Sequence, residues 1–423
     1  MFKNLLAYRN ILFVLIFLNS EAIFLTDDKK AGIPFLREAY LLAIVGLAFA
    51  LCLIWRRVYQ SKAALWILFF GVFLPVFSAI LAYVNFGQPL PYGLLEERRS
   101  MAWLSFFVML FLLIKTRPDQ RQIEGFFLVS AIAASVIGFM YYLSIIPDNA
   151  MPSFAKNVRD VGDLRPNRYR IGAGYVTLAV FILLYRLRDK LSLKSLGLVL
   201  YFTAYLWLVL QTRSTMLVWA VAAVWIFRKR LDSAAKVGLT AGLLLGMSYL
   251  LFPEFYLQQY EKLLLLYDEA VNSPGVRDDT MATIMQALRE NNYVGKGALS
   301  LQWNDGFAAL YDPHFYLSDV GIVGVYYRFG FLTPLIALLF YGGFIYFMRQ
   351  VPVKGPLLSA FQLGFWIGLF NMFLSNAIMF GGDTLGITLA CFLYFAKVQL
   401  TAAQPDYERV NHDPIHYRHY KLE

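Results

Sequence analysis

Charged residues and cysteines are both scarce in this 423-residue chain, and each shortage excludes a class of protein. Asp, Glu, Lys and Arg make up 16% of the residues, against roughly 25% in an ordinary soluble domain, which excludes a cytosolic enzyme and a disordered regulator. The two cysteines, Cys52 and Cys391, lie far apart within apolar runs, which excludes a disulfide-stapled secreted module. Hydrophobic residues, in contrast, make up 59% of the chain. This composition predicts a polytopic membrane protein.

The apolar residues form long continuous runs. A bilayer core of about 30 Å needs about 20 apolar residues per helix, whereas a membrane-spanning strand would alternate apolar and polar residues. We therefore expect an all-α protein whose residues 1–423 form a single integral membrane domain with about twelve transmembrane helices. The first run also resembles a signal peptide, but we expect an uncleaved first helix because many spans follow. The runs are 10–25, 38–55, 63–84, 101–114, 125–146, 171–185, 195–211, 214–227, 237–252, 331–348, 356–376 and 384–396.

Basic residues predict the orientation of these spans. Lys and Arg concentrate on the cytoplasmic side of membrane proteins. If the N-terminus is cytoplasmic, the N-terminal segment, the inner loops and the C-terminal segment from Lys397 onward hold 22 of the 38 basic residues, and the short outer loops hold five. The net charge of +10 is therefore explained by membrane orientation and does not indicate nucleic-acid binding. We expect both termini to be cytoplasmic.

Two outer segments are too long and too polar to be simple connectors: the extracytoplasmic loops 147–170 and 253–319. Loops longer than about 15 residues are usually functional or disordered. The aromatic and apolar content of 253–319 argues against disorder, so we expect a folded cap with short helices, including an amphipathic helix at 278–291.

Arginines lie at several points of the same outer face. The apolar stretch 195–227 would be about 50 Å long as one helix, so we expect a break at 211–215 that places Arg213 at an outer helix junction. Arg277 and Arg170 are predicted to reach the same side. Arg328 lies in the run 315–348, which glycines and a proline should divide into a kinked or re-entrant segment lining a cavity. Guanidinium groups suit phosphate oxygens, although arginines near helix ends also commonly extend to lipid headgroups.

His314 is the one histidine outside the cytoplasmic tail. Taken alone, it is more often a hydrogen-bonded structural residue. In a basic, aromatic outer cavity it would be a base near neutral pH. Such a cavity suits a lipid-linked diphosphate donor and a hydroxyl acceptor, because arginines neutralise the departing diphosphate and the histidine takes the proton of the acceptor. This scheme requires no metal and no cofactor.

Four short motifs follow one another in an order that resembles the O-antigen ligase/polymerase superfamily, which has a GT-C-like architecture. The resemblance implies a metal-independent, inverting transfer of a glycan from undecaprenyl diphosphate to a sugar hydroxyl at the periplasmic face. It implies that Arg213 and Arg277 hold the diphosphate and that His314 is the base or orients the acceptor. The motifs are Gln211-Thr212-Arg213-Ser214-Thr215, Arg277-Asp278-Asp279-Thr280, Asn291 to Gly297, and Pro313-His314-Phe315-Tyr316-Leu317.

The remaining site residues and partners follow from the same resemblance. Arg170, Arg328, Tyr316 and Asp319 are predicted to bind substrate, and Asp319 could orient His314. The expected partners are the undecaprenyl-diphosphate-linked glycan, a glycan or lipid A-core acceptor, membrane lipid and a polysaccharide chain-length regulator. Polymerase and ligase remain open, since Phe315 stands where the family often has Asn and the glycines after Asp319 are closer to chain polymerases.

Two other functions remain as alternatives. Asp27-Asp28 in the first outer loop could hold a metal in a GT-C enzyme that uses a lipid monophosphate donor. A flippase or transporter for a lipid-linked oligosaccharide would instead favour internal repeats and charges deep within helices, and the sequence shows no clear repeat. No P-loop pattern is present, which argues against nucleotide-driven chemistry.

Overall fold

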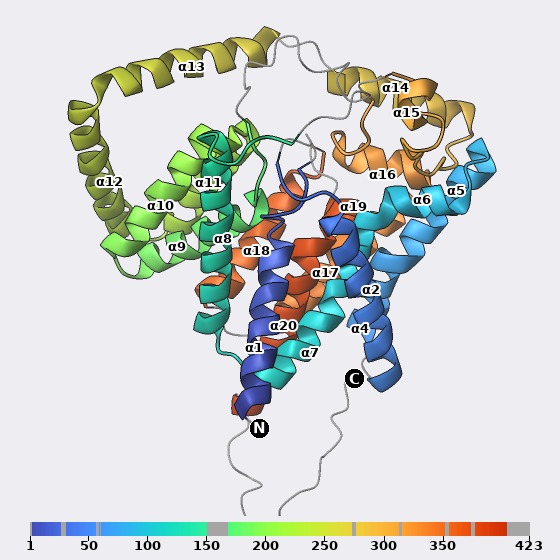
Figure 1. Cartoon of the computed structure of the whole chain (residues 1–423), viewed down its shortest axis with the longest axis horizontal. Helices are drawn as coiled ribbons and strands as arrows, with labels where there is room; N and C mark the ends of the chain where they lie inside the picture. The colour runs from blue at the N-terminus through green and yellow to red at the C-terminus, as the bar shows by residue number, and fades with distance from the viewer. Residues whose placement is uncertain are drawn as a thin grey trace, which may run out of the picture.

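The structure is a computed structural model of the whole chain. It describes residues 2–26, 31–55, 59, 61–149, 168–272, 276–312, 315–351, 355–373 and 377–403. Within these residues every regular element is helical, which confirms the all-α prediction for the described part of the chain. Figure 1 shows the helices packed side by side, with α13 crossing the top of the molecule.

The first 142 residues form a series of membrane-length helices, two of which include a stretch of non-α helix. A π-helical segment joins α4 to α5, and a 3₁₀ segment joins α6 to α7. The elements are α1 (Phe2–Asn19), α2 (Leu36–Ile54), α4 (Lys62–Leu68), η1 (Phe69–Phe73), α5 (Leu74–Phe86), α6 (Leu90–Glu96), η2 (Glu97–Leu104), α7 (Ser105–Thr116) and α8 (Gln120–Tyr142).

The second half begins with four helices and continues into the predicted cap before returning to the helical bundle. The elements are α9 (Ala173–Asp189), α10 (Leu193–Tyr205), η4 (Leu206–Leu210), α11 (Arg213–Phe227), α12 (Leu231–Leu251), α13 (Pro253–Asn272), α14 (Val276–Glu290), α15 (Gly306–Leu310), α16 (Gly321–Phe329), α17 (Thr333–Arg349), α18 (Pro356–Phe370), α19 (Ala377–Phe380) and α20 (Gly382–Ala403).

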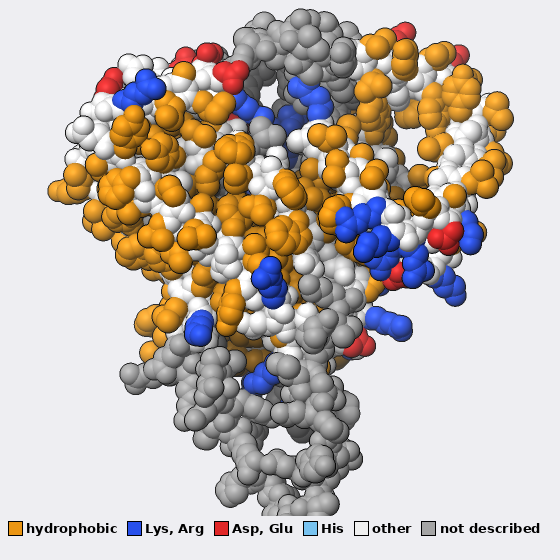
Figure 2. Space-filling view, turned by 180° about the vertical axis from the view of Figure 1, so that it is seen from behind, with side chains coloured by type: hydrophobic (Ala, Val, Ile, Leu, Met, Phe, Trp, Pro, Cys, Tyr) orange, Lys and Arg blue, Asp and Glu red, His pale blue; other side chains and the backbone are white. Residues whose placement is uncertain are grey.

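Each of the twelve predicted runs overlaps a helix, and among the described residues six helices are long and apolar enough to cross a membrane. Four further apolar helices are shorter, and exposed side chains such as Leu243, Val224 and Leu250 cover a broad hydrophobic surface (Figure 2). The chain is therefore a multi-pass membrane protein by helix length and composition, whereas the count of twelve and the GT-C-like architecture remain predictions. The six are Leu36–Ile54, Lys62–Phe86, Leu90–Thr116, Gln120–Tyr142, Leu193–Leu210 and Leu231–Leu251.

The predicted break in 195–227 is confirmed. The π-helical segment η4 ends at Gln211, whose backbone is in the left-handed region with φ 47°, and α11 begins at Arg213. The buried Gln211 side chain donates from Nε2 to the carbonyl of Leu208 at 2.7 Å, which helps to terminate the helix there. The predicted interruption of 315–348 is also found, because Gly330 with φ 56° separates α16 from α17.

The segment after α13 has a hydrophobic core of its own. Helix α14 confirms the predicted helix at 278–291, and it packs against α16. Phe315 is buried among the rings of Phe307, Tyr311 and Tyr327, with centroid distances of 4.7 to 6.0 Å. The pKa of Tyr311 is raised by burial and, to a smaller extent, by Glu290. Phe315 is therefore a core residue of this cap.

The Asn291–Gly297 motif is a close-packed connector between the cap and the bundle. Lys296 and Gly297 donate their backbone N–H groups to the carbonyls of Tyr327 and Arg328, at 2.9 and 3.1 Å. Gly297 has φ 77°, and a Cβ there would lie 2.3 Å from the carbonyl oxygen of Ser78. Only glycine permits this conformation and this approach to α5.

Candidate functional site

The three residues with predicted catalytic roles lie in separate parts of the chain. Arg213 is the first residue of α11 and Arg277 is the second residue of α14, and both side chains are exposed. Figure 1 shows α11 beside α8 to α10, whereas α14 lies above α16 on the other side of the molecule. His314 lies outside the described residues, as do Asp27 and Asp28. The structure therefore does not bring Arg213 and Arg277 together, and their convergence with His314 remains a prediction.

The structure brings Arg170 to the same junction as Arg213. Tyr169 donates its backbone N–H to the carbonyl of Val209 at 3.0 Å, and Tyr205 donates its hydroxyl to the carbonyl of Ile171 at 2.8 Å. Tyr169 and Ile171 are buried, whereas Arg170 between them is exposed. The segment before α9 is thus fixed against the end of η4, just before the turn that leads to Arg213.

Tyr316 and Asp319 lie between the cap core and α16. Tyr316 is half-buried, and Asp319 is exposed and accepts a hydrogen bond from the Ser318 hydroxyl at 3.1 Å. The orientation of His314 by Asp319 remains a prediction, because His314 lies outside the described residues.

Arg328 occupies a different environment from the predicted one, in which it would line an open cavity. Its side chain is 2% exposed, and its Nε donates to Glu97 Oε1 at 2.8 Å. The Ser78 hydroxyl donates to the same oxygen at 2.6 Å, and the Phe380 ring centroid lies 5.5 Å from the guanidinium carbon. Arg328 is therefore paired with Glu97 inside the protein, because burying an unpaired cation is energetically costly.

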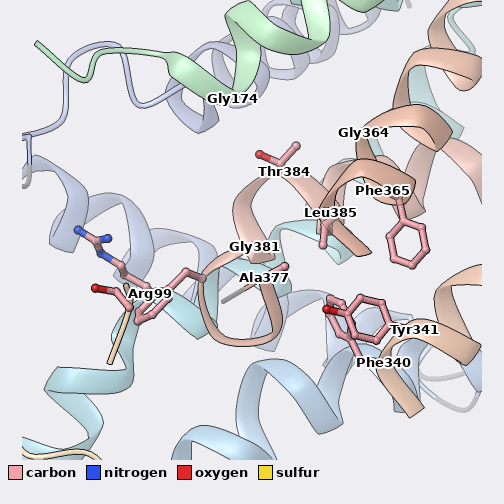
Figure 3. A pocket seen from close by; sticks show the side chains of 13 residues that line it. Arg99, Gly174, Phe340, Tyr341, Gly364, Phe365, Ala377, Gly381, Thr384 and Leu385 are labelled. Atoms are coloured by element: carbon pink, nitrogen blue, oxygen red, sulfur yellow. The ribbon is translucent and has the colours of Figure 1, made fainter. Parts of the chain in front are cut away.

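A cavity of about 470 Å³ lies between η2, α9 and α17 to α20. Figure 3 shows Arg99 at one end and the aromatic rings of Phe340, Tyr341 and Phe365 at the other. Ser318, four residues after His314, also lines the cavity. The volume lies within the range of small-molecule sites, about 300–1,000 Å³.

Glycines keep this cavity open. A Cβ at Gly368 would meet no heavy atom within 4 Å, and the nearest atoms to a Cβ at Gly174 and Gly364 would be 3.8 and 3.4 Å away. Neither close packing nor a positive φ requires glycine at these three positions. Glycine in a helix is roughly 1 kcal/mol less favourable than alanine. What these glycines provide in return is the free volume of the cavity.

A second, smaller cavity of about 80 Å³ adjoins the first and shares Arg99 and Phe380 with it. Charged residues line it: Glu21 and Arg37, which form an ion pair at 3.3 Å, and Asp383 at the start of α20. Arg99 therefore lies between an apolar cavity and a charged one. This arrangement can hold an amphiphile, with an anionic group beside Arg99 and an apolar chain against the aromatic wall.

Sequence reasoning missed Arg99 and Asp383. Arg99 belongs to a short outer loop in the predicted topology. The one local indication of a site there is its position two residues before the apolar run 101–114. Its neighbours in the cavity come from residues far away in the sequence, such as Tyr341 and Thr384. Among the residues that the structure describes, no group of three or more His, Cys, Asp or Glu side chains is arranged to hold a metal ion.

The chain was compared with protein-family models, with curated proteins and with solved structures. None of the three comparisons finds a match. The arrangement of the site is therefore interpreted from its own chemistry.

Proposed function

We propose that this protein transfers a glycan from undecaprenyl diphosphate to a sugar hydroxyl at the periplasmic face of the bacterial inner membrane. The observation that carries the proposal is the cavity of about 470 Å³, which has a cation at one end and aromatic walls at the other. A lipid-linked diphosphate has the same two parts, an anionic head and a long apolar chain. In this proposal the chain enters the cavity and the diphosphate lies towards Arg99 and the outer surface.

The chemical step is an inverting substitution at the anomeric carbon of the donor sugar. The acceptor oxygen forms a bond to that carbon while the bond to the diphosphate oxygen breaks, and the diphosphate leaves with the electron pair. The step requires Arg213 and Arg277 to approach the diphosphate beside Arg99, where they would neutralise the charge that develops on it. His314 would take the proton from the acceptor hydroxyl.

The acceptor determines whether the proposed enzyme is a polymerase or a ligase. A growing glycan would make the protein a polymerase, with a chain-length regulator as a further partner, and a lipid A-core acceptor would make it a ligase. The fixed position of Arg170 beside the Arg213 junction supports a cationic outer surface that could meet either acceptor.

Purified full-length protein in proteoliposomes tests the proposal. An undecaprenyl-diphosphate oligosaccharide is supplied with and without a core-lipid acceptor, and product length is measured by gel electrophoresis and mass spectrometry. A ladder of products supports a polymerase, and a single transfer to the core lipid supports a ligase. Absence of transfer by correctly inserted protein under both conditions contradicts the proposal.

A further inference from the structure

An apolar groove of about 400 Å³ lies between α9, α10 and α11, away from the cavity described above. Residues from all three helices form its walls. Leu184, Val199 and Ala223 line one end, and Leu206 and Met216 line the other. On α11 the groove extends from Met216 to Ala223, which is about 10 Å at 1.5 Å per residue. The groove therefore extends along the helices over about 10 Å, the length of a part of an acyl chain.

Basic residues gather at one end of this groove. They belong to the α9–α10 and α11–α12 connections, and we call them the basic rim. Leu184 precedes Arg186 by two residues, Val199 follows Lys194 by five, and Ala223 precedes Arg228 by five. At 1.5 Å per residue, these basic residues are displaced along the helices by about 3 to 8 Å from the groove. The rim consists of Arg186, Arg188, Lys190, Lys194, Arg228, Lys229, Arg230 and Lys236.

The basic rim keeps a positive surplus after its acidic neighbours are considered. Arg186 forms an ion pair with Glu124, and Arg188 forms one with Asp189. Asp232 is the third acidic residue nearby, so eight basic residues face three acidic ones and five positive charges remain. Figure 2 shows blue side chains gathered where the hydrophobic surface of these helices ends.

The far end of the groove is tied to α13. Trp207, which lines the groove, donates from Nε1 to Gln259 Oε1 at 2.8 Å, and Trp219 donates from Nε1 to Thr177 Oγ1 at 3.1 Å. Both indole N–H groups are thus bonded to protein, and their rings are left to form an apolar wall. The rim end carries eight basic residues, whereas Arg170 and Arg213 lie near the far end. The larger positive charge at the rim would orient an anionic amphiphile with its head there.

We infer that the groove and the basic rim bind one anionic phospholipid, with an acyl chain in the groove and the phosphate at the rim. Charge complementarity decides this occupant, since basic residues beside a membrane attract anionic headgroups by about 1 kcal/mol each. The volume of about 400 Å³ suits a ligand chain. A transmembrane helix of a partner protein would instead have to pack with its axis about 8–10 Å from the axes of the groove helices. The inference is independent of the proposed glycan transfer.

Lipid binding to the detergent-purified full-length protein tests the headgroup half of this inference. Native mass spectrometry with added phosphatidylglycerol or phosphatidylcholine measures which lipid stays bound. We expect retention of phosphatidylglycerol, and binding weaker on the order of 100-fold in the variant R228Q/K229Q/R230Q. The matched control K115Q/R117Q/R121Q removes three positive charges from another connection and should bind as the wild type does. Equal binding of both lipids, or equal loss in both variants, overturns the inference.

A substitution that fills the groove tests whether an acyl chain binds there. Ala223→Phe places a ring in the groove, whereas Val224→Phe places the same ring on a side chain that is 72% exposed. We expect at least about a tenfold loss of phosphatidylglycerol binding in the first variant, since losing about five chain atoms at 0.3 kcal/mol each costs that much. If Ala223→Phe is not monodisperse in gel filtration, Ala223→Leu takes its place. Unchanged binding in the monodisperse groove variant, or equal loss in both positions, overturns the inference.

Discussion

Arg328 and Glu97 join two parts of the chain that are 231 residues apart. The pair is buried, with side chains 2% and 1% exposed, and it connects α16 to the 3₁₀ segment η2. Arg328 Nη1 and Glu97 Oε2 have no further hydrogen-bond partner among the described residues. A buried pair of this kind stabilises little by itself, but removing one partner leaves an uncompensated charge.

A double-mutant comparison tests the structural role of Arg328. Glu97→Gln alone should lower the free energy of unfolding by about 3–5 kcal/mol, because Arg328 then lacks its anion. Glu97→Gln combined with Arg328→Met should recover most of that loss, since neither charge remains. Thermal unfolding of the detergent-purified proteins measures the effect. A double variant as unstable as the single one would contradict the structural role.

Arg213 and Arg277 differ from Arg328 because both are exposed at helix starts. If they hold the diphosphate, Arg213→Ala or Arg277→Ala should reduce the transfer rate about 10²–10³-fold, as is typical when one group that stabilises developing charge is removed. Lysine at either position should restore only part of the rate, because it lacks the planar fork. Initial rates in proteoliposomes measure this, and full activity of both lysine variants would argue against a diphosphate clamp.

At the scale of helices, the cavity depends on glycines of α9 and α18 and on rings of α17 and α18. Gly368→Leu should fill the space where the lipid chain is proposed to lie, because Gly368 lines the cavity and a Cβ there meets nothing within 4 Å. An isoprene unit has about five heavy atoms, and at roughly 0.3 kcal/mol per atom its exclusion should raise the donor KM about tenfold.

Gly342→Leu is the matched control for this substitution. Gly342 is also helical, also has nothing within 4 Å of a Cβ, and lies on an exposed face of α17. Its variant should keep the wild-type KM. Equal effects of the two substitutions on the donor KM would contradict donor binding in the cavity.

The helices were predictable from sequence because their signal is local. Twelve apolar runs fall on helices, and the excessive length of 195–227 with its polar centre predicted the break before Arg213. The cavity was not predictable, because Arg99, Tyr341 and Thr384 meet through packing across about 280 residues of sequence. The same holds for Arg328, whose partner is distant, and for Asn291–Gly297, whose glycines permit close backbone packing.

At the scale of the whole molecule, the two proposed amphiphile sites lie in separate places. The central cavity contains Arg99, and the groove of α9 to α11 ends at the basic rim. In the proposed orientation the first lies towards the periplasmic half and the second towards the cytoplasm. One protein could therefore hold a lipid-linked donor and a structural phospholipid at the same time.

Metal removal distinguishes the proposed chemistry from the alternative based on Asp27-Asp28. Treatment of the reconstituted protein with EDTA should leave the transfer rate unchanged, because arginines carry the charge of the leaving group in the proposed step. The rate is measured before treatment, after treatment and after readdition of Mg²⁺ or Mn²⁺. Inhibition that either ion reverses would favour the metal-dependent enzyme.

Transfer by wild-type and His314→Ala proteins, compared in the same proteoliposomes, is the most direct measurement of the proposed activity. The donor is undecaprenyl-diphosphate oligosaccharide, and insertion and donor binding are measured in parallel. We predict glycan transfer by the wild type and a rate about 10²–10⁴-fold lower for His314→Ala, with donor binding retained, because only the proton acceptor is lost. Transfer at the wild-type rate by His314→Ala, or no transfer by the wild type, would contradict this chemistry.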